Sequence, residues 1–284
     1  MGLGGLVFAA GLPGCGSAAA APPVRGRSED FFFLQLSDTH WGFQGAPNPQ
    51  ADVTLEHAVA TINAVDALPD FVVFTGDLTH TTDDPGVRRE RMKRFRDIVS
   101  ALRVKDVRFL PGEHDASLDR GEAFREHFGD PTYAFDHKGV HFVALDNVSL
   151  PGGAIGEPQL AWLEADLARL PADAPVVVLA HRPLFPLFPE WEWATRDGAR
   201  AIEVLQRRQN VTVFYGHIHQ EHHFATGAVM HHAARSLIFP LPGPGSVPKK
   251  APLPWDAASA DHGLGWRAVA LGGESPRITE VPYR

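Results

Sequence analysis

The sequence predicts an α/β fold in one large domain, and three observations lead to this. Strand-like and helix-like segments alternate from residue 31 onward, which is the pattern of layered α/β proteins. The first two strand-like segments are continuous apolar runs, as expected for strands buried on both faces. The 284 residues are enough to bury a full core. Because no segment reads as a linker between domains, we expect residues 29–284 to form a single unit.

The first half of this domain is predicted to be a βαβ unit followed by a helix and a strand. Residues 31–36 and 71–74 predict strands, and residues 53–68 between them carry apolar residues at helical spacing. A helical crossover makes the two strands parallel and places them at the centre of a sheet. A helix over 87–102, rich in arginine and glutamate, and a strand over 107–110 follow.

The second half is predicted to contain three more buried strands. Residues 140–145, 176–179 and 211–215 are rich in β-branched residues, and helices near 158–170 and 198–206 separate them. C-terminal to these strands and helices, the sequence shows no further helical periodicity.

From residue 229 to 278 short apolar stretches alternate with prolines and glycines, which predicts antiparallel strands and long loops. Within this region the proline-rich residues 241–256 predict an extended surface loop, with Lys249 and Lys250 at its tip.

Residues 1–28 differ in composition from the rest of the chain. No charged residue occurs before Arg25, and a run of small residues begins at Ser17. This pattern predicts an export signal, and hence a periplasmic or other extracytoplasmic location in a bacterium. A disordered N-terminus is the alternative, and Cys15 follows a stretch resembling a lipoprotein box, which would give a lipid anchor. No later segment is apolar for long enough to cross a membrane.

Net charge and cysteine content exclude several classes of function. The formal net charge of −8 argues against general affinity for nucleic acid or anionic membranes. The single cysteine, Cys15, excludes an intrachain disulfide framework and a thiolate metal cluster. Any metal ion would therefore be held by oxygen and nitrogen ligands.

Acidic residues or histidines directly follow five of the predicted strands. Open α/β sheets place ligand sites at the carboxyl ends of their strands, so these side chains are expected to meet. Each motif alone arises often by chance, whereas five in order do not. The motifs are Asp38-Thr39-His40, Gly76-Asp77, Gly112-Glu113-His114-Asp115, His181-Arg182 and Gly216-His217-Ile218-His219.

These residue types predict a centre of two metal ions. Carboxylate oxygen and imidazole nitrogen suit zinc, manganese and iron, and we expect iron with manganese or zinc. In Asp38-x-His40 and His217-x-His219, an extended chain would turn both side chains to one side, so that each pair converges. Glycine stands before the acid or histidine in three motifs, which would permit tight turns near the site. The predicted ligands are Asp38, His40, Asp77, Glu113, His181, His217 and His219.

The ordered motifs resemble the calcineurin-like metallophosphoesterase family, whose pattern is Asp-x-His, Gly-Asp, Gly-Asn-His-Asp/Glu, His and Gly-His-x-His. The resemblance spans residues 31–225. It implies a four-layer α/β/β/α sandwich of two mixed β-sheets flanked by helices. It also implies a division of the ligands: the first metal by Asp38, His40 and His219, the second by His181 and His217, with Asp77 bridging.

The resemblance further implies roles in catalysis. His114 would face the substrate and protonate or stabilise the leaving group, steered by Asp115. Arg182 would bind a phosphate oxygen. Glu113 stands where the family has asparagine. It either still binds the second metal, adding one negative charge, or leaves that site weak or empty.

Other polar and aromatic residues leave two interpretations open. His222, His223, His231 and His232 predict either a rim of solvated histidines or a further metal site. His80 is either a partner of a metal ligand or a plain loop residue. The arginines between residues 88 and 96 predict a solvated helix face. Aromatic residues in the loops either stack on a substrate or pack a lid: Trp41, Phe185, Phe188, Trp191 and Trp193.

We therefore expect metal-dependent hydrolysis of a phosphate ester, by a hydroxide bound to both metals. A small phosphodiester is favoured, because the compact length and the Gly-His-x-His-Gln ending resemble bacterial cyclic-nucleotide phosphodiesterases. A phosphomonoesterase or nucleotidase is the alternative within the same class. From another class, the chain could be an exported metal-binding protein with little or no hydrolase activity.

Overall fold

The computed structural model describes residues 30–259, 263–272 and 275–283. The predicted export segment, residues 1–28, lies outside these ranges. Within them, none of the helices combines the length and the apolar character that a bilayer crossing requires.

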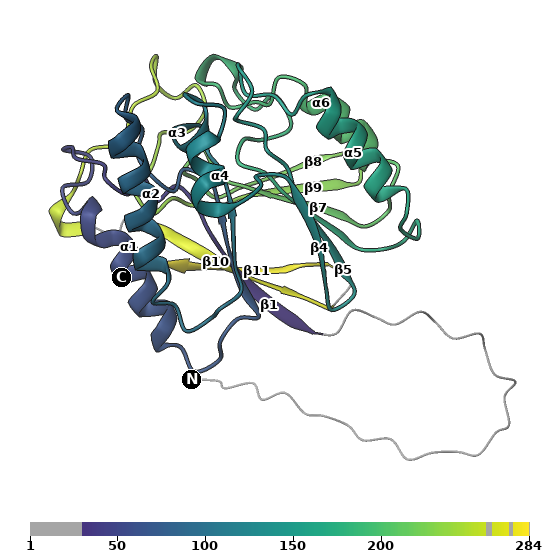
Figure 1. The fold of residues 1–284 in the computed structure, drawn as a ribbon, viewed down its shortest axis with the longest axis horizontal. Helices are drawn as coiled ribbons and strands as arrows, with labels where there is room; N and C mark the ends of the chain where they lie inside the picture. Colours follow the sequence, from purple (N-terminus) through teal and green to yellow (C-terminus); the bar gives the residue numbers. More distant parts are fainter. Residues whose placement is uncertain (1–29, 260–262, 273–274, 284) are drawn as a thin grey trace, which may run out of the picture.

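The described chain alternates strands with helices, as predicted (Figure 1). The strands are β1 (Phe31–Leu36), β2 (Phe71–Thr75), β3 (Val107–Leu110), β4 (Tyr133–His137), β5 (Val140–Ala144), β6 (Val176–Leu179), β7 (Val211–Tyr215), β8 (His222–Thr226), β9 (Val229–Ala233), β10 (Gly265–Leu271) and β11 (Arg277–Pro282). The helices are α1 (Ala51–Ala64), α2 (Pro85–Val99), α3 (Glu113–Ala116), α4 (Glu122–Phe128), α5 (Glu157–Leu167) and α6 (Gly198–Leu205), with 3₁₀ turns at Pro189–Trp191 and Ala257–Ser259.

The strands form two mixed sheets. The first has the order β11-β10-β1-β2-β3, in which β1, β2 and β3 are parallel and the other two are antiparallel to their neighbours. The second has the order β4-β5-β6-β7-β9-β8, with β5, β6, β7 and β9 parallel. The predicted βαβ unit is confirmed, because β1 and β2 are parallel neighbours that pair Leu34 with Val72.

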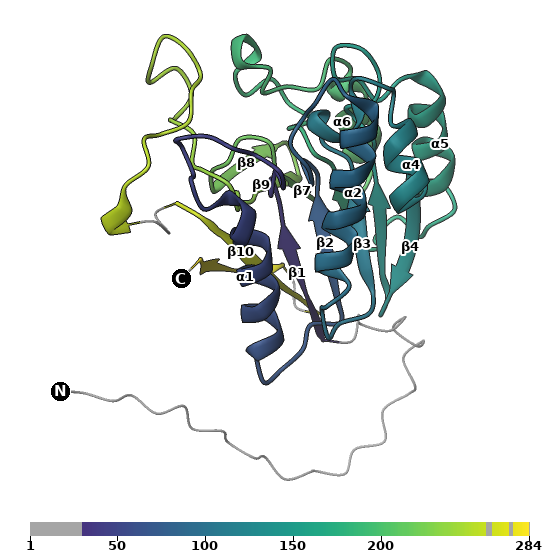
Figure 2. The ribbon, with the colours of Figure 1, turned by 60° about the vertical axis from the view of Figure 1, so that its left-hand side comes forward.

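Helices cover the outer face of each sheet, so the molecule has four layers (Figures 1 and 2). Leu55 of α1 and Phe95 of α2 pack in one core with the outer face of the first sheet. Leu163 of α5 lies in another core, with α6 and the second sheet. A third core fills the space between the sheets, where Phe33 stacks on Phe71 with ring centroids 4.9 Å apart. The predicted four-layer sandwich is confirmed.

Two elements of the prediction need correction. Strand β9 pairs with β8 in antiparallel orientation, but it also lies parallel to β7, so the final region does not consist of antiparallel strands alone. Strand β4 and the short helices α3 and α4 were not predicted, because residues 113–137 carry mixed polar and apolar residues without a sustained period. Strand β8 was also not predicted, since it precedes the region from residue 229 onward in which the final strands were expected. Residues 241–256 form neither helix nor strand, as predicted, although Lys250 is held by the carbonyl of Trp191 at 3.0 Å.

Candidate metal centre

All seven predicted ligands come together at the carboxyl ends of β1, β2 and β3 in one sheet and of β6 and β7 in the other. Their nitrogen and oxygen atoms form two groups, and within each group the atoms lie within 4.8 Å of one another. Each group has the donor atoms of a site for a borderline metal ion. The first group is Asp38, His40 and His219, and the second is Asp77, Glu113, His181 and His217.

Asp77 lies between the two groups. Its Oδ2 atom is 3.4 Å from Nε2 of His40 and also 3.4 Å from Nε2 of His181. Asp38 Oδ1 faces Nε2 of His219 at 3.3 Å within the first group. One carboxylate oxygen therefore adjoins imidazole nitrogens of both groups, which is where a carboxylate bridging two ions would lie.

The atoms of the second group face one another without forming hydrogen bonds. Glu113 lies 2.9 Å from His181 Nε2 through one oxygen, and 2.9 Å from His217 Nδ1 through the other. Both nitrogens and one of these oxygens are buried and lack a hydrogen-bond partner. Buried polar atoms rarely stay unsatisfied, so this cluster fits an ion that all of them would bind.

Five residues of the site adopt the left-handed backbone conformation, with φ between 43° and 67°. Non-glycine residues rarely do so, and each costs about 1–3 kcal/mol. The prediction of extended Asp-x-His and His-x-His segments is therefore wrong. His217 and His219 also diverge, one into each group, whereas Asp38 and His40 share a group. The five residues are Asp38, His40, Asp77, His217 and His219.

The glycines before the site residues are required for two different reasons. Gly76 has a φ of +99° and makes the predicted tight turn. Gly112 has an ordinary φ of −100°, but a Cβ atom there would lie 2.0 Å from Oδ1 of Asp77. A Cβ atom on Gly216 would lie 1.9 Å from the hydroxyl of Ser37. At these two positions the lack of space, rather than the turn, demands glycine.

The imidazoles of the two groups are held from outside by hydrogen bonds to their second nitrogen. Such bonds fix the tautomer and leave the other nitrogen free for a metal. Three of the four rings donate to a backbone carbonyl: His181 Nδ1 to Thr75 at 2.7 Å, His219 Nδ1 to Phe239 at 2.7 Å and His217 Nε2 to Glu192 at 3.1 Å.

Burial and close charges shift the pKa values in the centre. Burial and the charge of Glu113 would raise the pKa of Asp77, but His181 and other imidazoles lower it to about 2. Burial would also raise the pKa of Glu113, yet the neighbouring histidines hold it well below its usual value. Burial lowers the pKa of His40 well below normal. Burial would lower the pKa of His181, but the charges of Asp77 and Glu113 raise it well above normal. Asp77, Glu113 and His40 thus have the charge states of metal ligands at neutral pH, whereas His181 would release a proton on binding a metal.

His114 lies beside the first group, but Asp115 does not steer it. The ring of His114 packs edge-on against His40 at 4.5 Å, and its Nδ1 accepts from the N–H of Thr81 at 3.3 Å. The carboxylate of Asp115 instead accepts hydrogen bonds from the backbone N–H groups of residues 78, 79 and 112 and from the hydroxyl of Thr79, at 2.9–3.0 Å. Asp115 therefore holds the loop that carries Asp77.

Arg182 lies in the wall of a cleft of about 410 Å³, together with Glu113, His114 and Glu192. Its side chain is largely buried, and Nη2 lies 4.0 Å from the carboxylate of Glu192. Sequence reasoning did not predict Glu192, because no motif surrounds it. Its backbone is also left-handed, with a φ of 62°.

Asn147 is a further residue that sequence reasoning missed. It is fully buried, and its Oδ1 accepts from the N–H groups of His181 at 3.2 Å and Arg182 at 3.3 Å. Its Nδ2 donates to the carbonyl of Arg182 at 2.9 Å. Asn147 therefore holds the segment that presents both residues, and only its place in the fold reveals this.

The histidine-rich strands β8 and β9 do not form another metal group. In the part of the chain that the structure describes, none of their histidines joins a set of three possible ligands. His231 is fully buried and bonds to the hydroxyl of Thr226 at 2.7 Å, while His223 is exposed and lies 2.7 Å from His232. The interpretation as a solvated rim is therefore right only in part.

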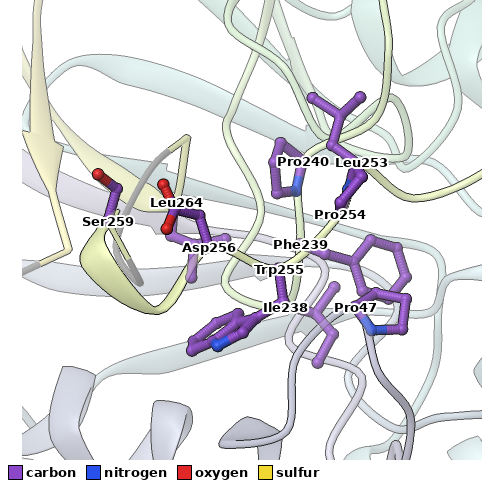
Figure 3. Close-up of a pocket in the computed structure, with 10 residues that line it drawn as sticks. All are labelled: Pro47, Ile238, Phe239, Pro240, Leu253, Pro254, Trp255, Asp256, Ser259 and Leu264. Carbon is purple, nitrogen blue, oxygen red and sulfur yellow. The ribbon is translucent and has the colours of Figure 1, made fainter.

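Most of the predicted aromatic residues pack in the core. Phe185, Trp191 and Trp193 are buried with α5, α6 and the second sheet, which favours the packing interpretation. Phe239 instead reaches the centre, with its ring 5.1 Å from that of His219. Figure 3 shows Phe239 beside Pro47 in the wall of a pocket of about 220 Å³ that is rich in prolines.

The arginines of α2 are not all solvated. Arg88 is buried and pairs with Asp119 at 2.9 Å. Arg91 donates to the backbone carbonyls of His80 at 2.7 Å and Thr81 at 3.1 Å. These side chains therefore fix the loop after β2, which passes the metal centre.

Known proteins resemble this chain in sequence and in fold. A probable cyclic nucleotide phosphodiesterase of Rhodococcus erythropolis is 32% identical over 200 residues, which are 66% of this chain and 64% of that relative. Another, of Rhodopseudomonas palustris, is 29% identical over 76% of this chain and 83% of the relative. A dimetal phosphatase of Danio rerio superimposes with a TM-score of 0.55, at 17% identity over 89% of this chain and 99% of that structure.

The family model of the calcineurin-like phosphoesterases matches residues 33–221. This range contains all seven residues of the two groups together with His114 and Arg182. The resemblance predicted from the five motifs is thereby confirmed. The chain belongs to the calcineurin-like phosphoesterase family.

Proposed function

We propose that this protein hydrolyses phosphate esters, with phosphodiesters preferred, by means of two metal ions held in the two groups. The observation that carries the proposal is the position of Asp77, whose Oδ2 lies 3.4 Å from a ligand nitrogen of each group. Asp38, His40 and His219 would complete one site, and Glu113, His181 and His217 the other. The unsatisfied atoms of the second group support this assignment.

The donor atoms support iron with manganese or zinc, because imidazole and carboxylate suit these ions. Bound there, the ions would polarise the phosphate ester and activate the attacking water. The seven side chains would hold these ions, and the left-handed backbone at five of the seven directs those side chains into the centre.

His114 and Arg182 are proposed to act on the substrate directly. The Nδ1 atom of His114 accepts from Thr81, so the neutral ring carries its proton on Nε2. Through this N–H it could donate a hydrogen bond to the leaving oxygen and stabilise the negative charge that develops there. Arg182, in the same cleft, would bind an oxygen of the phosphate.

Three features support a diester as the substrate. Glu113 adds a negative charge where the family pattern has a neutral asparagine, which disfavours a doubly charged monoester. Glu192 adds another carboxylate to the cleft. The two bacterial relatives are described as probable cyclic nucleotide phosphodiesterases.

The test compares bis-p-nitrophenyl phosphate with p-nitrophenyl phosphate, using protein loaded with manganese, iron or zinc. We expect a higher kcat/KM for the diester. A higher value for the monoester would make the protein a phosphomonoesterase. If both Asp77→Asn and His181→Ala keep full turnover, the assignment of the centre is contradicted.

Glu113 is tested separately by counting metal ions per chain. We expect two equivalents in the wild type and weaker binding of one equivalent in Glu113→Asn. Unchanged affinity and stoichiometry would remove Glu113 from the ligand set. One equivalent in the wild type would mean that the second group does not hold a metal.

We further propose that the protein is exported, on the basis of the apolar, uncharged N-terminal sequence. Expression of the full chain in a bacterium, followed by fractionation and N-terminal sequencing, tests this. Recovery of uncleaved protein from the cytoplasm would contradict it, and a lipid on Cys15 would show anchoring.

A further inference from the structure

One imidazole of the centre is supported differently from the other three. His181, His217 and His219 each donate to a backbone carbonyl, which any sequence could supply. The Nδ1 atom of His40 instead lies 3.3 Å from Nδ1 of His80. The hydrogen-bond partner of the His40 ring is therefore a single side chain, that of His80.

The positions of the nitrogens decide which ring donates. Nε2 of His40 points into the centre, where it lies 3.4 Å from Asp77 Oδ2 and 3.4 Å from Nε2 of His219. A neutral His40 that offers Nε2 to a metal carries its proton on Nδ1. His80 must then accept that proton with its own Nδ1, and its remaining proton lies on Nε2.

The same ring of His80 also contacts His114. The two rings are stacked, with centroids 5.0 Å apart and an interplanar angle of 26°. The ring of Phe43 also packs nearly perpendicular to that of His80, with centroids 5.0 Å apart.

The backbone of His80 is anchored as well. Its N–H donates to Trp41 at 3.0 Å, and its carbonyl accepts from Arg91 at 2.7 Å. His80 is thus fixed by its backbone and contacts both His40 of the first metal group and His114, the candidate substrate-binding residue.

We propose that His80 is a positioning residue, which fixes the tautomer and orientation of His40 and braces the ring of His114. This inference rests on the proposed function for the identity of the centre. A hydrogen-bonded partner of a metal-binding histidine typically changes metal affinity about 10–100-fold. His80 would act on the first metal site and leave the second unchanged.

Two substitutions separate the two contacts. His80→Asn keeps a side-chain oxygen that can accept from His40, but it cannot stack on His114. His80→Phe keeps the stacking and removes the acceptor. His223→Ala, at an exposed position of β8, is the matched control. Circular dichroism and Tm of each full-length variant establish that it is folded.

The first measurement is the affinity of each Co²⁺ equivalent, by titration against a chelator and by the visible spectrum of Co²⁺. In His80→Phe we expect one equivalent to bind about 10–100-fold more weakly and its spectrum to change. In His80→Asn we expect affinity near that of the wild type, as in His223→Ala. Wild-type affinity for both equivalents in His80→Phe would overturn the proposal.

The second measurement is the split between kcat and KM on the preferred ester at saturating metal. His80→Asn should lower kcat with little change in KM, because only the support of His114 is lost. An unchanged kcat in this variant would overturn the role of His80 toward His114.

The number of Co²⁺ equivalents bound per chain also tests an alternative role for His80 as a metal ligand. His40, His80 and His114 could themselves surround an ion, and a third equivalent that binds to the wild type and is lost in His80→Phe would replace our proposal with a metal site. Absence of turnover in the wild type would contradict the proposed function alone, since the affinity measurements on His80 do not depend on activity.

Discussion

The Nε atom of Arg182 lies 3.6 Å from the carboxylate of Glu113. Arg182, which follows His181 in the sequence, therefore faces Glu113, the acid that stands where the family pattern has asparagine. Their proximity predicts that the two side chains depend on each other, because Arg182 offsets part of the added negative charge.

A double-mutant cycle tests this dependence. Arg182→Met should raise KM in wild-type protein, since a cation is lost from the cleft. We expect a smaller effect in the Glu113→Asn background, with a coupling energy of about 0.5–3 kcal/mol from kcat/KM. Additive effects of the two changes would show that Arg182 serves the substrate independently of Glu113.

We predict that Asp115 stabilises the fold and does not take part in proton transfer. Asp115→Asn would place an amide against the backbone N–H groups that the carboxylate now satisfies, and we expect a loss of about 1–3 kcal/mol in the free energy of unfolding. Urea denaturation measures this. The comparison is His114→Asn, which should lower kcat and leave stability near the wild-type value. A shifted pH profile of kcat in Asp115→Asn, with unchanged stability, would restore the steering role.

Gly112 is predicted to tolerate no side chain. A Cβ atom there would lie 2.0 Å from Oδ1 and 2.2 Å from the backbone nitrogen of Asp77. Gly112→Ala should therefore destabilise the protein by about 1–3 kcal/mol and weaken metal binding. Gly243→Ala is the control, because its nearest neighbour would be 3.9 Å away. Equal stability of the two variants would refute the steric argument.

Because the backbone at His217 is left-handed, we predict that glycine is more stabilising than alanine at this position, the reverse of the usual order. In metal-free protein we expect His217→Gly to be more stable than His217→Ala by about 1–2 kcal/mol, because alanine keeps the strain of a φ of 67°. His181, which has no positive φ, should show the opposite order. Thermal denaturation of the four variants tests this, and the same order at both positions would contradict it.

Metal binding is predicted to raise thermal stability in two increments. An ion that binds only the folded protein stabilises it by about 2.7 kcal/mol at a free concentration one hundred times its Kd. We expect Tm to fall on chelation and to rise again as each equivalent is added. His181→Ala should lose one increment and His223→Ala neither. An unchanged Tm after chelation would show that the ions do not bind the folded centre.

The sequence by itself determined the class of fold and the members of the centre. Buried apolar runs at 31–36 and 71–74 identify central parallel strands, because only a strand covered on both faces excludes polar residues. Acidic residues and histidines follow five predicted strands, and the structure brings them together at the carboxyl ends of strands from both sheets. The seven residues could therefore be predicted from the order of motifs after the strands, whereas Glu113 stands out as a departure only by comparison with the family pattern.

Only the tertiary structure decided how these residues are held. The left-handed conformation that separates His217 from His219 depends on packing, and no local pattern in the sequence predicts it. Asp115, Asn147 and His80 act through contacts with residues 34 to 40 positions away, such as the 3.3 Å approach of His80 to His40. Each of these contacts joins segments that follow neighbouring strands of the same sheet: β1 with β2, β2 with β3, and β5 with β6. Such partners come together only when the strands pair in the folded sheet. The sequence thus identifies the donor atoms, whereas strand pairing and loop contacts set their tautomers and orientation, and the packing of the two sheets divides them into two groups.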